Sequence, residues 1–372
     1  HGDSVTCSAV SHRSLAPFLS GSADGTVKLW DLMTRTEVAR IEAHTRTVNA
    51  VCFDLSGQAF YSCSDDGRIH RWNVHTDDGT TTHSPVVSWR INGSLKSLDH
   101  HHHDTTFATA SDESVQIWSP TRTTPIAKYD NLWNNSADTV NVVRFHPVEH
   151  HVIATCSADR GIGLHDTRVN QDLKKTILSM RSNDLQWNPM EPMIFCVANE
   201  DYNAYTFDMR KLNRPTRIYK GHTAAVMSAS WDKTGREFAT GSYDRTLRIF
   251  NVSENQSRDI YHTKRMQRIM TIQYTMDSKF LITGSDDSNL RLWKAKSNEE
   301  LGQLTSRQEA AQQYRSALVK KYQHLPEVRT IARSRKIPKV IRNQTNQARI
   351  QKESQARKQA NRVKYSKKGE HK

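Results

Sequence analysis

The chain lacks long apolar runs, paired cysteines and a recognisable leader. None of its 372 residues lies in a run approaching 18 consecutive apolar residues, which predicts no transmembrane helix. No signal peptide is visible, although the chain starts at a histidine, so we expect further residues upstream. The five cysteines are scattered and form no C-x-x-C pair, which favours reduced thiols in the cytosol or nucleus.

Common catalytic motifs are also missing. The sequence contains no G-x-x-x-x-G-K-[ST], H-E-x-x-H or G-x-S-x-G pattern. We therefore expect no enzyme, no catalytic residue, no cofactor, no metal and no small-molecule substrate.

Acidic residues are scarce in the last fifth of the chain. Residues 301–372 hold 19 Lys and Arg against 4 Asp and Glu, whereas residues 1–300 hold 34 against 35. The chain is thus a near-neutral body with a strongly basic tail. Such asymmetry indicates an anionic partner, nucleic acid first and a membrane surface second, and we expect no membrane binding.

A repeated unit fills the near-neutral body. Its clearest copy, SADGTVKLWD at residues 22–31, returns around Trp72, Trp118, His165, Phe207, Phe250 and Trp293. The anchors of successive copies lie 42 to 47 residues apart. An aspartate precedes every anchor by six residues: Asp24, Asp66, Asp112, Asp159, Asp201, Asp244 and Asp287. The regular period indicates a repeat architecture.

Each copy contains signals for four short strands separated by turn residues. Four strands in about 43 residues make one β-propeller blade, and the pattern resembles the WD40 repeat. We therefore predict an all-β, seven-bladed propeller over residues 1–304, with residues 301–304 as its last outer strand. A basic, mainly α-helical or extended tail would follow over residues 305–372.

Four histidines stand at the Gly-His position of the WD40 pattern: His1, His44, His222 and His262. The resemblance implies that each histidine, the turn aspartate, a strand hydroxyl and the tryptophan form a network inside the blade. A catalytic or metal role is the alternative, but seven regular copies favour stapling of the blades. Blades four to six replace the tryptophan with His165, Phe207 and Phe250 and should be less well stapled.

Two insertions and a histidine tract mark candidate surfaces. Residues 76–84 and 130–138 lengthen loops, and Trp133 in the second loop is either an interface anchor or packs on a blade edge. The tract at residues 100–103 resembles a metal-binding sequence. It lies in a turn without defined ligand geometry, so we expect no ordered metal there.

The basic tail changes to a helical period. Thr305 and Gln308 form a potential capping box, followed by an apolar stripe of Ala311, Tyr314, Leu318 and Tyr322. Pro326 and Glu327 indicate a second short helix, and the stripe is expected to dock on the propeller side. Residues 342–364 are polar all round, so we expect them to be extended or frayed until a polyanion orders them.

Two motifs make the tail specific. The segment KYQHLPEVRTIARSRKIPK at residues 321–339 and the ending NRVKYSKKG at 361–369 resemble the C-terminal domain of the Sof-one-like WD-repeat family. The resemblance covers the whole chain. It implies a nuclear and nucleolar component of the small-subunit processome, the particle built around U3 small nucleolar RNA that processes the 18S rRNA precursor.

On this resemblance the propeller docks other processome proteins and the tail contacts pre-rRNA and U3 RNA. Arginine suits bidentate phosphate contacts and lysine supplies a point charge. The candidate RNA contacts are Arg329, Arg333, Arg335, Lys336, Lys339, Arg342, Arg349, Lys352, Arg357, Lys358, Arg362, Lys364, Lys367 and Lys368. Tyr322 and Tyr365 are candidates for base stacking, although packing is the stronger interpretation for Tyr322.

The alternative function is a substrate receptor of a cullin-RING ubiquitin ligase. Such receptors carry Trp-Asp-x-Arg at blade ends. Near matches occur at Asp166 with Arg168 and at Asp208 with Arg210, but both lack the tryptophan. A generic cytosolic scaffold is a further alternative, against which the basic tail argues.

Overall fold

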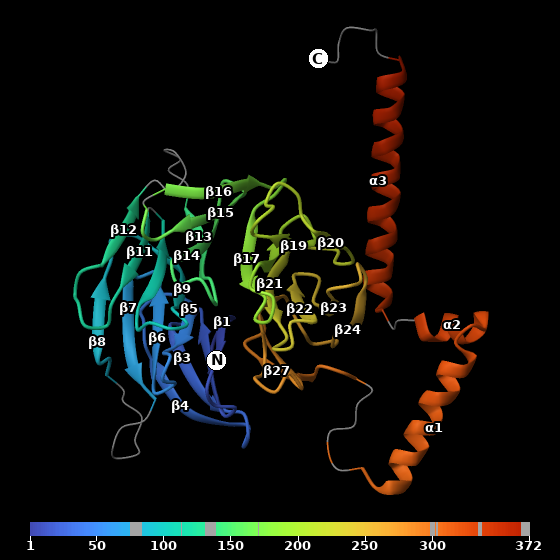
Figure 1. Ribbon diagram of the computed structural model, residues 1–372, viewed down its shortest axis with the longest axis horizontal. Coiled ribbons are helices and arrows are strands. Elements are labelled where there is room, and N and C mark those ends of the chain that lie inside the picture. Colours follow the sequence, from blue (N-terminus) through green and yellow to red (C-terminus); the bar gives the residue numbers. More distant parts are fainter. Residues whose placement is uncertain are drawn as a thin grey trace. The chain divides into compact units, whose positions relative to one another are not determined.

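The computed structural model describes residues 1–74, 84–112, 114–130, 139–169, 171–297, 302, 304–333 and 337–365. It divides into two compact units, His1–Ala295 and Lys296–Lys372. The first unit is a β-propeller and the second is helical (Figure 1). The predicted seven-bladed propeller with a helical tail is therefore confirmed. No helix of the described residues is both long and apolar enough to cross a membrane.

Seven antiparallel sheets form the blades, and each takes its strands from consecutive chain. Blade 1 comprises β1 (Val5–Val10), β2 (Pro17–Ser22), β3 (Thr26–Asp31) and β4 (Thr36–Glu42). Blades 2 to 4 comprise β5 (Val48–Phe53), β6 (Ala59–Ser64), β7 (Arg68–Asn73), β8 (Val87–Arg90), β9 (Leu95–His100), β10 (Phe107–Ser111), β11 (Ser114–Trp118), β12 (Ala127–Asp130), β13 (Val140–Phe145), β14 (Val152–Ser157), β15 (Gly161–Asp166) and β16 (Gln171–Ile177). Blades 5 to 7 comprise β17 (Ser182–Trp187), β18 (Ile194–Asn199), β19 (Ala204–Asp208), β20 (Arg217–Tyr219), β21 (Val226–Trp231), β22 (Glu237–Ser242), β23 (Leu247–Asn251), β24 (Ser257–Tyr261), β25 (Ile269–Tyr274), β26 (Phe280–Ser285) and β27 (Leu290–Lys294).

Burial along the strands explains the layered packing of the blades. The second strand of a blade, such as β6, is buried at every position because neighbouring blades cover both of its faces. The outer strand β4 instead alternates exposed and buried residues over its C-terminal half. The apolar clusters therefore lie between successive blades, as where Phe53, Phe60 and Trp72 pack with Leu19 and Val27 of blade 1.

The ring closes by contact between the first and last blades. Ser8 on β1 and Thr271 on β25 share a hydrogen bond of 2.6 Å between their hydroxyl oxygens. Gln273 donates from Nε2 to the carbonyl oxygen of Ser8 over 3.4 Å. Blade 7 has three described strands, and Gly302 and Leu304 of the predicted last outer strand lie outside any strand. Leu301 and Gln303 lie outside the described residues, so the predicted boundary at residue 304 stays a prediction.

The histidine networks differ between blades. In blade 2, His44 bonds to Asp66 (Nδ1, 3.1 Å) and to Ser62 (Nε2, 2.8 Å), and Trp72 also donates to Ser62. In blade 6, His222 makes the equivalent bonds to Asp244 (2.9 Å) and Thr240 (2.7 Å).

Other blades use different partners for the turn aspartate. In blade 1, His1 bonds to Ser20 and Thr26, and Asp24 accepts from the amide of Gly2. In blade 4, Lys175 donates to Asp159 at 2.6 Å. In blade 3, Asp112 accepts from Ser94, and in blade 5 Asp201 accepts from Tyr205. In blade 7, Arg291 pairs with Asp287, while His262 is exposed and takes no part.

The turns after the innermost strands tie neighbouring blades together. His101 Nδ1 accepts two amides of its own turn, and its Nε2 donates to the carbonyl of His150 in blade 4. His146 repeats both contacts and donates to the carbonyl of Pro192 in blade 5. Asn188 does the same with its amide group, donating to the carbonyl of Gly235 in blade 6. These contacts of His101, His146 and Asn188, which we call the latch, therefore link the turns of blades 3 to 6.

The helical unit contains α1 (Ser306–Tyr322), α2 (Pro326–Arg333) and α3 (Lys339–Tyr365). Gln308 Oε1 accepts from the amide of Thr305 at 3.1 Å, as the predicted capping box requires. Tyr314 and Tyr322 of the predicted stripe are exposed. Its docking on the propeller stays a prediction.

Residues 342–364 were predicted to be extended or frayed. In the structure they form most of helix α3. The reason is intrinsic propensity, since α3 is rich in Gln, Arg, Lys and Ala and contains neither proline nor glycine. The predicted surface loops fall largely on residues 75–83 and 131–138, including Trp133, which lie outside the described residues.

Candidate interaction sites

Helix α3 is a cationic rod. Its 27 residues span roughly 40 Å at the usual rise per residue. All eight basic side chains predicted to contact RNA on it are exposed: Lys339, Arg342, Arg349, Lys352, Arg357, Lys358, Arg362 and Lys364. Steps of about 100° per residue distribute them around the whole helix. A helix of this kind can neutralise phosphates on several sides.

The charge of α3 is almost unopposed within the described part of the tail. Its single acidic residue, Glu353, lies 3.8 Å from Arg349, and both side chains are exposed. An exposed pair of this kind is weak and readily exchanged for another anion. Tyr365 at the end of α3 is 77% exposed, with the ammonium of Lys364 5.6 Å from its ring.

The remaining predicted RNA contacts are placed only in part. Arg329 is exposed on α2, and Arg333 ends that helix. The side chain of Arg333 and the whole of Arg335, Lys336, Lys367 and Lys368 lie outside the described residues.

The two predicted ligase-adaptor pairs share one geometry. Arg168 donates to Asp166 from Nε (3.1 Å) and Nη2 (2.8 Å), and Arg210 contacts Asp208 in the same way at 3.1 and 2.9 Å. Hydrogen bonding from Arg168 lowers the pKa of Asp166 to about 2. Both guanidinium groups are more than 60% exposed. Two adjacent blades therefore present matching Asp–Arg forks.

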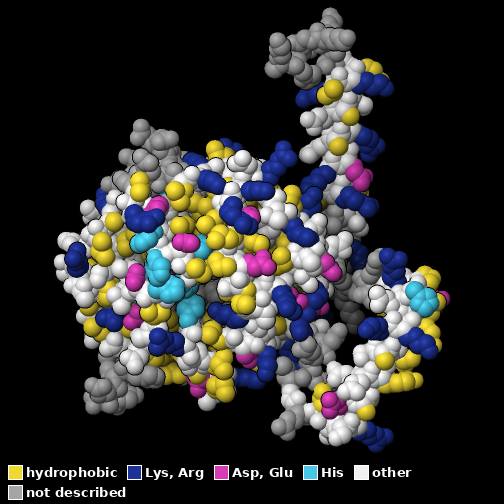
Figure 2. All heavy atoms as spheres, in the orientation of Figure 1, with side chains coloured by type: hydrophobic (Ala, Val, Ile, Leu, Met, Phe, Trp, Pro, Cys, Tyr) yellow, Lys and Arg dark blue, Asp and Glu magenta, His cyan; other side chains and the backbone are white. Residues whose placement is uncertain are grey.

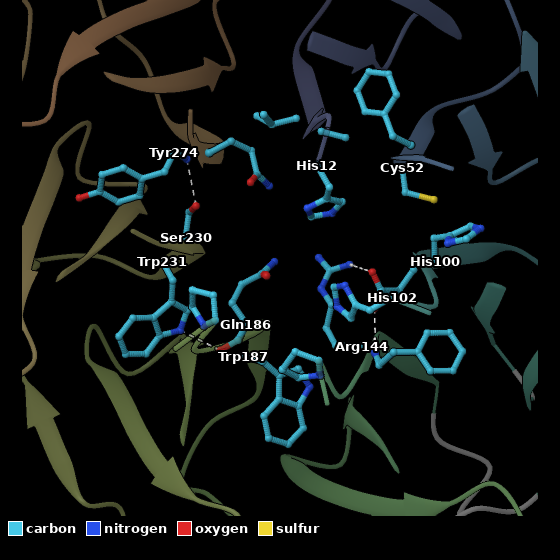
Figure 3. A pocket seen from close by; sticks show the side chains of 18 of the residues that line it. His12, Cys52, His100, His102, Arg144, Gln186, Trp187, Ser230, Trp231 and Tyr274 are labelled. Atoms are coloured by element: carbon cyan, nitrogen blue, oxygen red, sulfur yellow. Dashed lines mark hydrogen bonds and ion pairs between the residues drawn. The ribbon is translucent and has the colours of Figure 1, made fainter. Parts of the chain in front are cut away.

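The channel through the propeller opens into a cavity of about 190 Å³ on the side of the turns that follow the innermost strands (Figure 3). His12, His102, Arg144 and Gln186 point into it. The sequence analysis named His102 only as part of the histidine tract at residues 100–103, and it did not single out the other three. The signal was present, because His12, His102 and Lys233 each lie seven positions after the first residue of their blade's inner strand.

Arg144 braces one wall of this cavity. Its guanidinium lies 3.8 Å from Asp99 and 3.5 Å from Asp184, and Nε donates to the carbonyl of Leu185. Burial alone would lower the pKa of Arg144, but the two carboxylates raise it above its usual value. The charge of Arg144 is therefore already compensated.

Histidines gather on the propeller face shown in Figure 2. Ring contacts connect His101 and His103 with His150, the rings of His103 and His150 lying 4.5 Å apart. His101, Asp104 and His150 place potential ligand atoms within 4.8 Å of one another. However, Nδ1 of His101 already accepts two amides and Nε2 donates to a carbonyl, so neither nitrogen offers a free lone pair.

Family comparisons agree with this division of the chain. A model of the WD domain, G-beta repeat, matches residues 1–31, 35–73, 83–119, 213–251 and 259–294. These segments correspond to blades 1 to 3, 6 and 7, and leave the blades anchored by His165 and Phe207 unmatched. A model of the Sof1-like domain matches residues 295–372.

Curated relatives match almost the whole chain. "DDB1- and CUL4-associated factor 13" is 42% identical in Mus musculus and 39% identical in Danio rerio, in each case over 99% of this chain and 82% of that protein. "Protein SOF1" of Saccharomyces cerevisiae is 36% identical over 97% of this chain and 77% of that protein. The chain therefore belongs to the family of WD-repeat proteins that carry a C-terminal Sof1-like domain.

Proposed function

We propose that this protein is a non-catalytic scaffold of the nucleolar small-subunit processome, acting in 18S rRNA precursor processing and 40S subunit biogenesis. The propeller docks neighbouring processome proteins, and the basic tail contacts pre-rRNA or U3 small nucleolar RNA. The observation that carries the proposal is the exposed cationic helix α3 inside a Sof1-like domain. Relatedness to the yeast protein SOF1 supports the same assignment.

The physical case for RNA rests on unmatched charge. Helix α3 exposes eight basic side chains against one glutamate. Helix α3 has little apolar surface to bury, so packing it against a protein core would yield little stabilisation. Release of counterions from RNA phosphates supplies a driving force that suits such a surface.

A second function is favoured by the paired Asp–Arg forks and by the printed name of several relatives. In it, Arg168 and Arg210 contact the adaptor of a cullin-RING ubiquitin ligase. The name "DDB1- and CUL4-associated factor 13" describes those relatives as associated with DDB1 and CUL4. The two functions can coexist because the forks lie on the propeller and the cationic helix lies in the tail.

Affinity purification of the full chain from nuclear extract, read by RNA sequencing and mass spectrometry, tests both. Enrichment of U3 and 18S precursor RNA with processome proteins is the expected result. Recovery of a cullin adaptor without RNA would replace the processome assignment by the ligase one. In the double variant Arg168→Ala, Arg210→Ala, any adaptor should be lost while the RNA is kept.

A further inference from the structure

The channel mouth brings together cationic and imidazole groups from three separate blades. Lys233, His12 and His102 occupy corresponding positions of blades 6, 1 and 3, and all three line the same cavity. Pro147 and Pro189 occupy the same position in blades 4 and 5. The five positions are spread from residue 12 to residue 233, so only closure of the ring brings them to one rim.

The ammonium of Lys233 lacks a counterion in this cavity. Among the residues that the structure describes, its Nζ makes no hydrogen bond or ion pair, although burial lowers its pKa and the adjacent Asp232 opposes that effect. Asp99, the carboxylate in the wall, accepts from the amide of Phe145 at 2.7 Å and faces Arg144. The carboxylate of Asp99 is therefore paired with Arg144 and does not pair with Lys233.

The two imidazoles experience the same positive field. Desolvation and then the charge of Lys233 lower the pKa of His12. Desolvation also lowers the pKa of His102, where Asp99 opposes and Lys233 adds to the effect. The rings of His12 and His102 lie 5.8 Å apart. The channel mouth thus holds the donor groups of Lys233, His12 and His102 in an arrangement that favours a negatively charged ligand.

We propose that this channel mouth binds the carboxylate of an acidic side chain from a segment of a partner protein, with Lys233 as counterion and His12 and His102 as N–H donors. The proposal rests on the protein-docking role proposed for the propeller and names its ligand chemistry. The cavity of about 190 Å³ is smaller than the roughly 300–1,000 Å³ of small-molecule sites, so it admits one or two side chains. One unpaired ammonium matches one carboxylate.

Size and charge disfavour RNA at this position. A nucleotide brings a base and a sugar together with its phosphate, which is more than the cavity holds. Phosphate recognition typically uses arginine forks, whereas the guanidinium of Arg144 is held by Asp99 and Asp184.

Binding of a carboxylate should be coupled to proton uptake. The anion favours the charged imidazoles, so it raises the pKa of His12 and His102. The groups that face these rings are Lys233, His100, Asp99, His101 and His103. Affinity should therefore rise as the pH falls from 7.5 to 6.

Photocrosslinking of the full chain with a benzophenone-labelled hexaglutamate peptide tests the proposal. Mass spectrometry maps the crosslinks, which separates the mouth from the basic tail. Crosslinks are expected on the turns around residues 12, 102 and 233, and a labelled hexaglutamine peptide should not form them. Lys233→Gln should reduce them at least about tenfold, whereas Lys279→Gln, at an exposed lysine of the blade 7 turn outside the cavity, should not.

Three results would overturn the proposal: crosslinks confined to residues 305–372, equal labelling of the two lysine variants, or stronger labelling of the mouth by an oligouridylate probe. Melting curves establish that Lys233→Gln is folded. If it is not, His12→Gln at an exposed position serves instead and should flatten the pH dependence. Absence of precursor RNA from the purification would contradict the processome function but would leave these crosslinks unchanged. Failure of the processome function and failure of the channel-mouth proposal are therefore distinguishable.

Discussion

The propeller and the helical unit differ in where their side chains find partners. The propeller buries apolar side chains between its blades, closes its ring through Ser8 and Thr271, and holds the buried His146 and His222 with carbonyl, carboxylate and hydroxyl partners. Among the described residues of the helical unit, Ile341 alone is buried. The first unit is thus specified by its own packing, whereas the second offers charge and exposed aromatics to other molecules.

Because of this difference, we expect the stability of the fold to depend on the propeller core and RNA binding to depend on the helical unit. A substitution of a buried side chain in the blades acts mainly on the free energy of unfolding, whereas a substitution in α3 acts mainly on contacts with a partner. Each prediction below tests one side of that division against the other.

Removal of residues 342–372 should have the largest effect. We expect RNA crosslinking to be abolished, because nine of the fourteen candidate RNA contacts lie in residues 342–372, while the propeller keeps its melting temperature. Crosslinking and sequencing of the bound RNA, with melting followed by circular dichroism, measure both halves. Undiminished crosslinks would assign RNA binding to residues 1–341 and contradict the role given to α3.

Loss of one buried carboxylate should have the next largest effect. Asp244 accepts from His222, Thr246 and the amide of Thr223, and both it and His222 are buried. Asp244→Ala should lower the free energy of unfolding by roughly 3 kcal/mol, because it leaves several buried donors without an acceptor at about 1–3 kcal/mol each. Urea unfolding measures the loss.

The matched control lies in blade 5, where no histidine contacts the corresponding Asp201. That aspartate accepts from the amide of Asn203 and the hydroxyl of Tyr205. Asp201→Ala should therefore cost only about 1 kcal/mol. Equal losses in the two variants would show that the histidine network does not set blade stability.

Much of this architecture was predictable because the repeats are local. The aspartate six residues before each anchor defined the blades, and Thr305 and Pro326 marked the starts of α1 and α2. The helical state of residues 342–364 was harder, because the absence of a buried face argued against a helix while the residue composition favoured one.

The channel mouth was not predicted because it depends on ring closure. Lys233 stands more than 200 residues from His12, and no local pattern distinguishes it from other turn lysines. Only alignment of the blades by their inner strands brings the corresponding positions into one list. Arg291 is similar, since in blade 7 it pairs with the turn aspartate Asp287 from four residues later in the chain, where no histidine pattern points to it.

Acid should weaken the propeller and leave the helical unit unchanged. Burial lowers the pKa of His146 and His222, although Pro192 and Asp244 respectively oppose the shift. Below about pH 6.5 the unfolded chain therefore binds protons that the folded propeller refuses, and stability falls with the pH.

The smallest expected effect comes from one latch histidine. His146→Asn installs the group that blade 5 already uses at Asn188, which accepts the turn amides and donates across the blade boundary without titrating. Between pH 7 and pH 5 the melting temperature of the variant should fall less than that of the unaltered protein. Each kcal/mol of unfolding free energy that is kept corresponds to about 2–4 °C in melting temperature. Calorimetric scans at the two pH values measure the difference. An identical pH response would mean that other histidines carry the acid sensitivity, and a loss of helical signal over the same range would place part of it in the tail.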